Sequence, residues 1–216
     1  MSAKPETQFL QHLDEHIELA EATRALAKDY ALIAETCAGA ILQGKKILFC
    51  GNGGSAADAQ HWAAELVSRL RKERSPMPAL ALTTDTSALT AILNDYGADQ
   101  VFSKQIEALA NPGDILLGIT TSGNSANIIR AFQAGRSMGT YNLLFTGNKG
   151  GKLLGELAPL KLIDRALVVA SNSTMRIQEM HILLAHSLCA HIEDAWIAKY
   201  GAVGKFDPKK ARDQAA

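Results

Sequence analysis

Five short apolar runs that alternate with segments of helical periodicity constrain the fold of this chain more than any other feature. The runs occupy residues 46–50, 78–82, 115–119, 141–145 and 166–170. Strands buried on both faces of a sheet read as continuous apolar runs, and helices between them are typical of parallel connections. We therefore expect an α/β fold of three layers, in which helices flank a five-stranded parallel sheet.

Long helical segments lie on either side of this alternating region. An apolar stripe over residues 9–41 predicts a long N-terminal helix over 6–43, with room for one break. The stripe is longer than one face of a sheet requires, so we expect this helix to pack against other copies of the chain. The segment 175–199 predicts a long closing helix. We expect a single domain over residues 1–200 and a polar C-terminal tail over 201–216.

Charge and composition narrow the classes of partner. The 216 residues include 22 Lys plus Arg and 22 Asp plus Glu, so the formal net charge is zero. A neutral chain lacks the electrostatic footprint of a general nucleic-acid binder and the basic bias of a membrane-surface protein. No apolar stretch approaches the roughly 20 residues of a membrane helix, and the N-terminal residues lack an apolar run of the secretory type. We expect a cytoplasmic protein with no nucleic-acid or membrane partner and with three reduced cysteines.

A glycine-rich loop follows the first apolar run. It reads Gly51-Asn52-Gly53-Gly54-Ser55, with Ser55 expected as the N-cap of the next helix. Glycines let a ligand approach the backbone closely, and the start of a helix offers free N–H groups to an anion. One alternative is a tight turn with no ligand. Another is a dinucleotide site, for which the acidic residue expected roughly 20 residues later has only Asp85 as a candidate, and Asp85 comes late.

A second loop, after the third apolar run, is rich in hydroxyl groups. Its sequence is Thr120-Thr121-Ser122-Gly123-Asn124-Ser125, and a helical segment follows. Hydroxyl and backbone N–H donors at the start of a helix can surround a phosphate. Because the loop has no lysine, we expect the phosphate to be held as a handle on a sugar rather than transferred. The alternative is an ordinary capping cluster of serine and threonine.

Four polar side chains form a candidate metal site. His61 and Glu65 are four residues apart, on one face of the helix that follows the glycine loop. Gln178 and His186 lie in the closing helix, eight residues and therefore roughly 80° apart around its axis. Two imidazoles, a carboxylate and an amide suit a divalent metal such as zinc. The alternative for His61 and Glu65 is an ion pair on the helix surface.

Taken together, these motifs resemble a known family, the phosphoheptose isomerases, which are the sedoheptulose 7-phosphate isomerase branch of the flavodoxin-like SIS fold. The resemblance covers residues 5–198 and rests on CGNGGSAADAQHWAAEL (50–66), LTTDTSALTAILNDYG (82–97), GDILLGITTSGNSANI (113–128) and RIQEMHILLAH (176–186). It implies an aldose–ketose isomerase that forms D-glycero-D-manno-heptose 7-phosphate through an enediol, the first step of bacterial ADP-heptose and lipopolysaccharide biosynthesis. It also implies a homotetramer with one zinc ion per subunit.

The resemblance also assigns roles to individual residues. It implies that Glu65 and His186 are the catalytic pair and that the metal ligands are His61, Glu65, Gln178 and His186. It implies that the sugar-phosphate substrate contacts Asn52, Gly53, Gly54, Ser55, Glu65, Asn94, Asp95, Thr120, Thr121, Ser122, Ser125 and Gln178. For Asp95, a helix-end cap is an equal alternative to a substrate contact.

Two positions depart from the family pattern. Thr120 stands where many members have serine, and Met175 stands where some members have an acidic residue. The chain also resembles related SIS proteins that act as non-catalytic adaptors of the replication initiator DnaA. Those adaptors lack the acidic residue at position 65 and the histidine at 186, and this chain has both. An enzyme is therefore the favoured interpretation, and the adaptor is the alternative.

Overall fold

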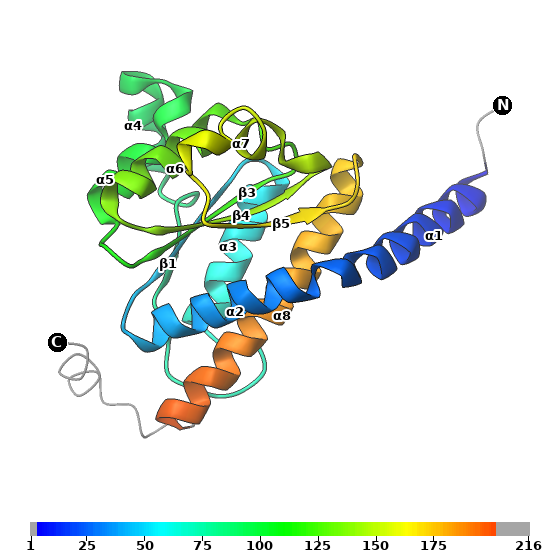
Figure 1. Ribbon diagram of the computed structural model, residues 1–216, viewed down its shortest axis with the longest axis horizontal. Coiled ribbons are helices and arrows are strands. Elements are labelled where there is room, and N and C mark those ends of the chain that lie inside the picture. The colour runs from blue at the N-terminus through cyan, green and yellow to red at the C-terminus, as the bar shows by residue number, and fades with distance from the viewer. Residues whose placement is uncertain (1–3, 202–216) are drawn as a thin grey trace.

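Five parallel strands form the centre of the computed structural model, which describes residues 4–201 (Figure 1). They are β1 (Ile47–Gly51), β2 (Ala79–Ala81), β3 (Ile115–Thr120), β4 (Tyr141–Gly147) and β5 (Arg165–Val169). Their order in the sheet is β2-β1-β3-β4-β5, and every neighbouring pair is parallel. The predicted five-stranded parallel sheet is confirmed, with each strand within two residues of its predicted bounds.

Alternate residues of the strands enter two separate cores. On one face, side chains such as Phe49, Leu117 and Phe145 pack under α2 (Ala27–Leu42), α3 (Gly54–Val67) and α8 (Thr174–Tyr200). On the other face, side chains such as Leu48 and Leu116 pack under α5 (Ser103–Leu109), α6 (Ala126–Met138) and α7 (Gly151–Leu154). Helix α4 (Thr86–Tyr96) lies at the edge of this second layer (Figure 1). The predicted three layers are thus present.

The N-terminal helical segment is divided by one turn of 3-10 helix. This turn, Arg24–Leu26, separates α1 (Pro5–Thr23) from α2, at the kind of break the sequence allowed. The second half packs on the sheet, whereas α1 extends beyond the body of the molecule (Figure 1). Leu19 is the buried residue of α1, and its exposed apolar residues are Phe9, Leu10, Leu13 and Ile17. The apolar stripe therefore continues onto a helix that this single chain leaves largely uncovered.

Other local predictions have mixed outcomes. The predicted N-cap Ser55 is wrong: the N-cap of α3 is Gly53, two residues earlier, and Ser55 is buried within the first turn of the helix. Cys37, Cys50 and Cys189 are all buried free thiols, as expected. Among the described residues, no helix is long and apolar enough to cross a membrane. The predicted tail over 201–216 lies outside the described residues apart from Gly201.

Candidate active site

The glycine and hydroxyl loops lie side by side because their strands are neighbours. Each loop follows the carboxyl end of its strand, and β1 pairs with β3 although β2 comes between them in the chain. Such a reversal of strand order is where open parallel sheets form their ligand-binding crevice. Two reciprocal amide hydrogen bonds of 2.9 Å join Asn52 of the first loop to Asn127, just after the second. Sequence reasoning missed Asn127. Its position in the first turn of α6, next to the hydroxyl loop, is the sequence feature that pointed to it.

Glycines in the first loop make room for a neighbouring helix. Gly53 has a φ of +56°, a conformation that side chains other than glycine rarely adopt. A Cβ atom on Gly54 would collide with the amide of Gln178, which comes from the first turns of α8. The loop is therefore shaped around a polar side chain from a segment more than 100 residues away. The positive φ explains Gly53, and the close approach of α8 explains Gly54 and places Gln178 beside the loop.

The hydroxyl loop is ordered by contacts within itself and with the loop after β4. Thr120 Oγ1 lies 3.3 Å from Ser125 Oγ and accepts a 3.3 Å hydrogen bond from the Gly123 amide. Ser122 Oγ accepts from the Asn124 amide at 3.2 Å. Ser125 occupies the N-cap position of α6, but its side chain makes no capping hydrogen bond. A purely capping role is thus disfavoured, and the amides at the start of α6 remain available to an anion.

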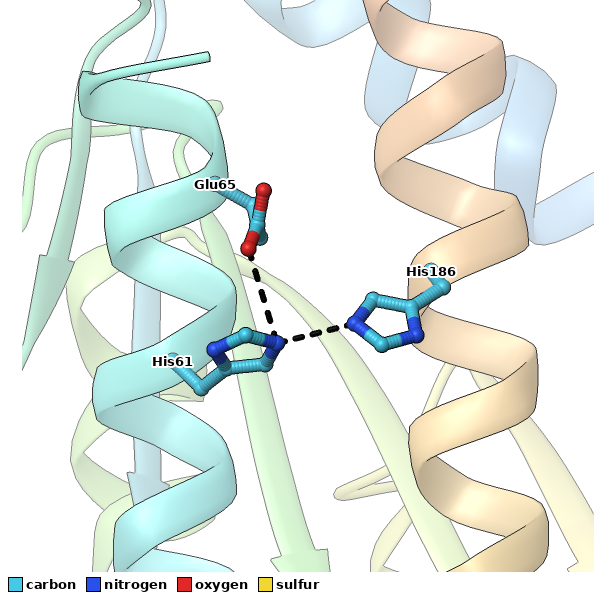
Figure 2. Close-up of side chains that lie close together, drawn as sticks. All are labelled: His61, Glu65 and His186. Atoms are coloured by element: carbon cyan, nitrogen blue, oxygen red, sulfur yellow. Dashed lines mark hydrogen bonds and ion pairs between the residues drawn. The ribbon is translucent and has the colours of Figure 1, made fainter. Parts of the chain in front are cut away.

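Three of the four predicted metal ligands meet between α3 and α8 (Figure 2). His61 Nε2 lies 2.8 Å from His186 Nε2 and 3.5 Å from Glu65 Oε1. One ligand atom from each of the three residues lies within 4.8 Å of the others. Two imidazole nitrogens and a carboxylate oxygen that converge in this way can hold a divalent cation or exchange a proton. His61 and Glu65 thus lie close together, as in the alternative of a simple surface pair, but His186 makes them part of a larger group of side chains.

The fourth predicted ligand, Gln178, occupies a different level of the same interface. Its amide lies at Gly54, whereas His61 is seven residues further along α3, roughly 10 Å at 1.5 Å per residue. Within one chain, Gln178 therefore lies with the glycine loop and not with His61, Glu65 and His186. This position suits the predicted substrate contact, and the role of Gln178 as a metal ligand stays a prediction.

Asp58 is a further titratable group on the same helix, one turn before His61. Burial raises the pKa of its carboxyl to about 6, against a smaller lowering effect of His61. Its Oδ2 atom is buried and has no hydrogen-bond partner among the described residues. Sequence reasoning missed Asp58, although its spacing of three from His61 placed it on the same side of the helix. Asp58 is therefore a further titratable group next to His61 in the candidate site.

The last two predicted contacts lie at the end of α4. Asn94 Nδ2 donates a 2.8 Å hydrogen bond to Asp95 Oδ1, and both residues are exposed. The structure pairs them with each other and not with either loop. Asp85, the candidate acid for a dinucleotide site, instead caps α4 by accepting a 3.0 Å hydrogen bond from the Ala88 amide. That local role leaves the dinucleotide alternative without its acidic residue.

Comparison with known proteins identifies close relatives. A family model described as SIS domain matches residues 8–147. The phosphoheptose isomerases of Paramagnetospirillum magneticum and Aliarcobacter butzleri are each 50% identical to this chain, over 184 and 188 residues. The matches cover 85% and 87% of this chain and 93% and 94% of those relatives.

Solved structures give the same result. The phosphoheptose isomerase of Neisseria gonorrhoeae superposes with a TM-score of 0.80 at 43% identity, over 88% of this chain and all of that one. That of Francisella tularensis has a TM-score of 0.83 at 36% identity, over 89% of this chain and all of that one. The sugar isomerase domain of a transcription factor from Sphaerobacter thermophilus, at 17% identity and a TM-score of 0.58, shares the fold alone.

Proposed function

This chain belongs to the phosphoheptose isomerase family of SIS-domain enzymes, and we propose that its own reaction converts sedoheptulose 7-phosphate to D-glycero-D-manno-heptose 7-phosphate. The family membership makes it a sugar-phosphate isomerase. We further propose that the product enters ADP-heptose and lipopolysaccharide biosynthesis. The observation that carries the proposal is the meeting of His61, Glu65 and His186 at an interface whose other end borders the glycine loop.

The phosphate of the substrate would bind at the hydroxyl loop. Ser122 is exposed, Ser125 makes no capping bond, and the first amides of a helix lack partners within the helix, so they can bind an anion. The positive end of the helix dipole adds a favourable field for a phosphate. Asn52, held by Asn127, would orient the hydroxyl groups of the sugar between the two loops. The phosphate thus acts as a handle that places the carbonyl end of the sugar toward the histidines.

Glu65 and His186 would move the protons. Conversion of a 2-ketose to an aldose removes a proton from C1, forms a cis-enediol and returns a proton to C2. A carboxylate and an imidazole on two facing helices can serve as these two groups, because a carboxylate can accept a proton and an imidazole can accept or donate one. The side chain of Glu65 is only 17% exposed, which limits competition from water at its oxygen atoms.

We propose that His61, Glu65 and His186 hold one zinc ion per subunit, since two imidazoles and a carboxylate whose ligand atoms converge are typical ligands of zinc. When bound, zinc would polarise the substrate carbonyl and stabilise negative charge on its oxygen. Gln178 is the proposed fourth ligand, although its amide lies at Gly54 within this chain. A carboxylate that binds zinc is a weaker base, so the two roles of Glu65 oppose one another.

The exposed apolar side of α1 supports the proposed homotetramer. Phe9, Leu13 and Ile17 recur every four residues and are 64%, 42% and 52% exposed. Such a stripe on a projecting helix is typical of a surface covered by another copy of the same chain.

Incubation of the purified protein with sedoheptulose 7-phosphate tests the proposed reaction. We expect NMR to show the anomeric proton of the aldose product, and we expect Glu65→Gln to remove that signal while the protein remains folded. Absence of turnover by the wild-type protein loaded with zinc would contradict the proposed substrate. If the same preparation bound DnaA in a pull-down, the adaptor would become the better interpretation.

A further inference from the structure

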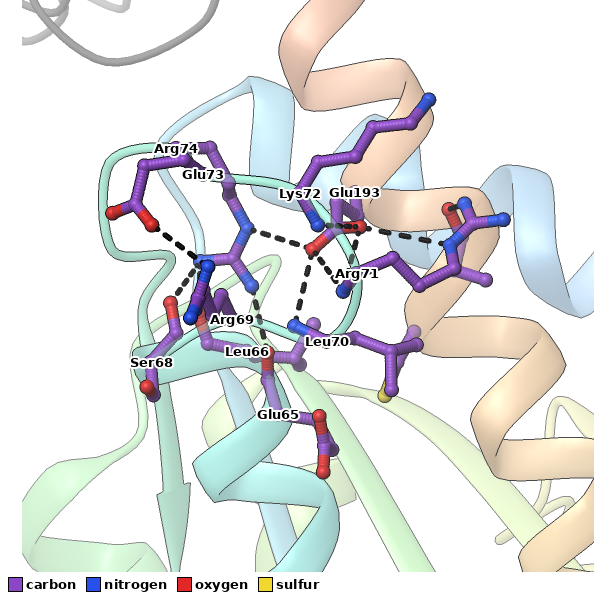
Figure 3. Close-up of polar contacts among 12 residues, drawn as sticks. Glu65, Leu66, Ser68, Arg69, Leu70, Arg71, Lys72, Glu73, Arg74 and Glu193 are labelled. Carbon is purple, nitrogen blue, oxygen red and sulfur yellow. Dashed lines mark hydrogen bonds and ion pairs between the residues drawn. The ribbon is translucent and has the colours of Figure 1, made fainter.

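The loop after α3 contains a buried arginine that folds back onto the end of that helix (Figure 3). Arg74 Nη2 donates to the carbonyl of Glu65 at 2.6 Å. Arg74 Nη1 donates to the carbonyls of Leu66 and Ser68 at 2.7 and 2.9 Å. The side chain of Arg74 has no exposed area. The last carbonyls of a helix lack partners within the helix, and Arg74 supplies donors to them at the turn that carries Glu65.

A buried glutamate from α8 holds the same loop. The carboxylate of Glu193 accepts hydrogen bonds from three consecutive backbone amides, those of Leu70, Arg71 and Lys72, at 3.1 to 3.3 Å. It also lies 3.5 Å from Nε of Arg74, and its side chain is fully buried. The loop therefore cannot shift along α8 without breaking an ion pair and several charge-assisted hydrogen bonds.

The spacing along α8 connects this contact to the proposed site. Glu193 follows His186 by seven residues, so the two side chains lie roughly 20° apart around the helix and about 10 Å apart along it. Both face α3 and its following loop. One continuous path therefore runs from the main chain of Glu65 through Arg74 to Glu193, and from there along two turns of helix to His186.

We propose that Arg74 and Glu193 are positioning residues that set the distance between Glu65 and His186. This inference rests on the proposed function, in which Glu65 and His186 act on one substrate. Neither Arg74 nor Glu193 touches the substrate: Arg74 fixes the main chain at Glu65, and Glu193 fixes Arg74 to the helix that carries His186. Catalytic groups displaced by about 1 Å can lose about 10²-fold in rate, so a small movement here has a measurable effect.

The chain offers a matched control at the amino ends of the central strands. The carboxylate of Asp114 is also buried, accepts hydrogen bonds from the amides of Lys46 and Asn111 at 3.0 and 2.7 Å, and forms an ion pair with Lys46. It lies at the amino ends of β1 and β3, whereas both loops of the candidate site lie at the carboxyl ends. Asp114→Asn therefore removes a comparable buried charge without touching α3 or α8.

The experiment compares Glu193→Gln and Arg74→Lys with Asp114→Asn and the wild-type protein. Glu193→Gln keeps the size of the side chain but removes its charge, and Arg74→Lys keeps the charge but not the planar fork that reaches several carbonyls. For both positioning variants we expect kcat to fall about 10-fold to 10²-fold with KM within about twofold of wild type, because the phosphate loop is untouched. We also expect weaker zinc binding in competition with a chelator. Asp114→Asn should lower the melting temperature and leave kcat within about twofold.

Each outcome separates the inference from a purely stabilising role. The inference would be overturned if Asp114→Asn and Glu193→Gln lost the same melting temperature and also lost kcat equally. It would also be overturned if Arg74→Lys kept the kcat and the zinc affinity of the wild-type protein. If Glu193→Gln does not fold, Arg74→Lys decides the question by itself. Glu65→Gln, assayed in parallel, tests the proposed function, because full activity of this variant refutes the catalytic role of Glu65. If Glu65→Gln loses activity while both positioning variants keep the wild-type kcat, only the inference about Arg74 and Glu193 is refuted.

Discussion

Protonation of His181 should make the protein less stable in weak acid. His181 lies in α8 with no exposed area, packs against Phe145, and has Nε2 3.2 Å from the carbonyl of Thr146. Burial lowers the pKa of its imidazole from 6.5 to about 4, against a smaller raising effect of the hydrogen bond to Thr146. The unfolded chain then binds a proton more tightly than the folded one. Stability from this group is complete above pH 6.5 and falls as the pH approaches 4.

The size of this loss follows from the two pKa values. Between pH 7 and pH 5 the difference in proton binding amounts to about 2 kcal/mol of unfolding free energy, at about 1.4 kcal/mol per pH unit near the steepest part. His181→Gln keeps a donor for the carbonyl of Thr146 but cannot titrate in this range. We therefore expect the variant to lose about 2 kcal/mol less than the wild-type protein over the same interval, whatever its stability at pH 7.

Urea unfolding of metal-free protein at fixed concentration, at pH 7 and pH 5, measures this difference. The comparison must be between variant and wild type, because Asp58 acts in the opposite direction: burial raises its pKa to about 6, so its contribution falls as the pH rises from 3.8 toward 6. Asp58 is common to both proteins and cancels. His191→Gln, at a partly exposed histidine of the same helix, controls for the substitution itself. Equal losses in wild type and His181→Gln would refute the reasoning.

Three further predictions concern the proposed site and assembly. Glu65→Gln and His186→Gln should each lower kcat by about 10²–10⁴-fold, with the double variant little worse than either; a Glu65→Gln enzyme that keeps its metal and runs within tenfold of wild type would contradict the assignment. Ser122→Ala with Ser125→Ala should chiefly raise KM for the sugar phosphate, and an unchanged kcat/KM would place the phosphate elsewhere. Leu13→Glu should reduce the mass measured by light scattering below that of a tetramer, whereas an unchanged mass would mean that α1 does not form the interface.

The sequence predicted the fold well because each strand carried its own signal. Buried parallel strands need continuous apolar residues, and all five runs, including 115–119 and 166–170, became strands. Predictions that depended on one residue were weaker. Ser55 had the chemistry of an N-cap, yet Gly53, with a φ of +56°, occupies that position two residues sooner. Local propensity gave way to the geometry of the glycine loop.

The two loops could be brought together from the sequence only through a general rule about sheets. Their strands are separated by more than 60 residues, but ligands of parallel sheets bind at the carboxyl ends of strands, and this rule selected both loops. The rule does not say which side chains join the loops. The pairing of Asn52 with Asn127 needed the strand order, and the Arg74–Glu193 contact needed the path of the loop after α3. Neither leaves a periodic trace in the sequence.

Gln178 shows that the angle around a helix does not by itself place a side chain. An angular separation of roughly 80° from His186 is compatible with a shared face, but eight residues also span about 12 Å along the axis. Because α3 runs beside α8, each level of one helix meets a different level of the other: Gly54 meets Gln178, and His61 meets His186. His61 and Glu65 lie close together because a spacing of four residues gives a small angle around the helix and a rise of about one turn. A ligand set read from helices must therefore satisfy the rise as well as the angle. His61, Glu65 and His186 satisfy both within one chain, and the role of Gln178 as a fourth ligand stays a prediction.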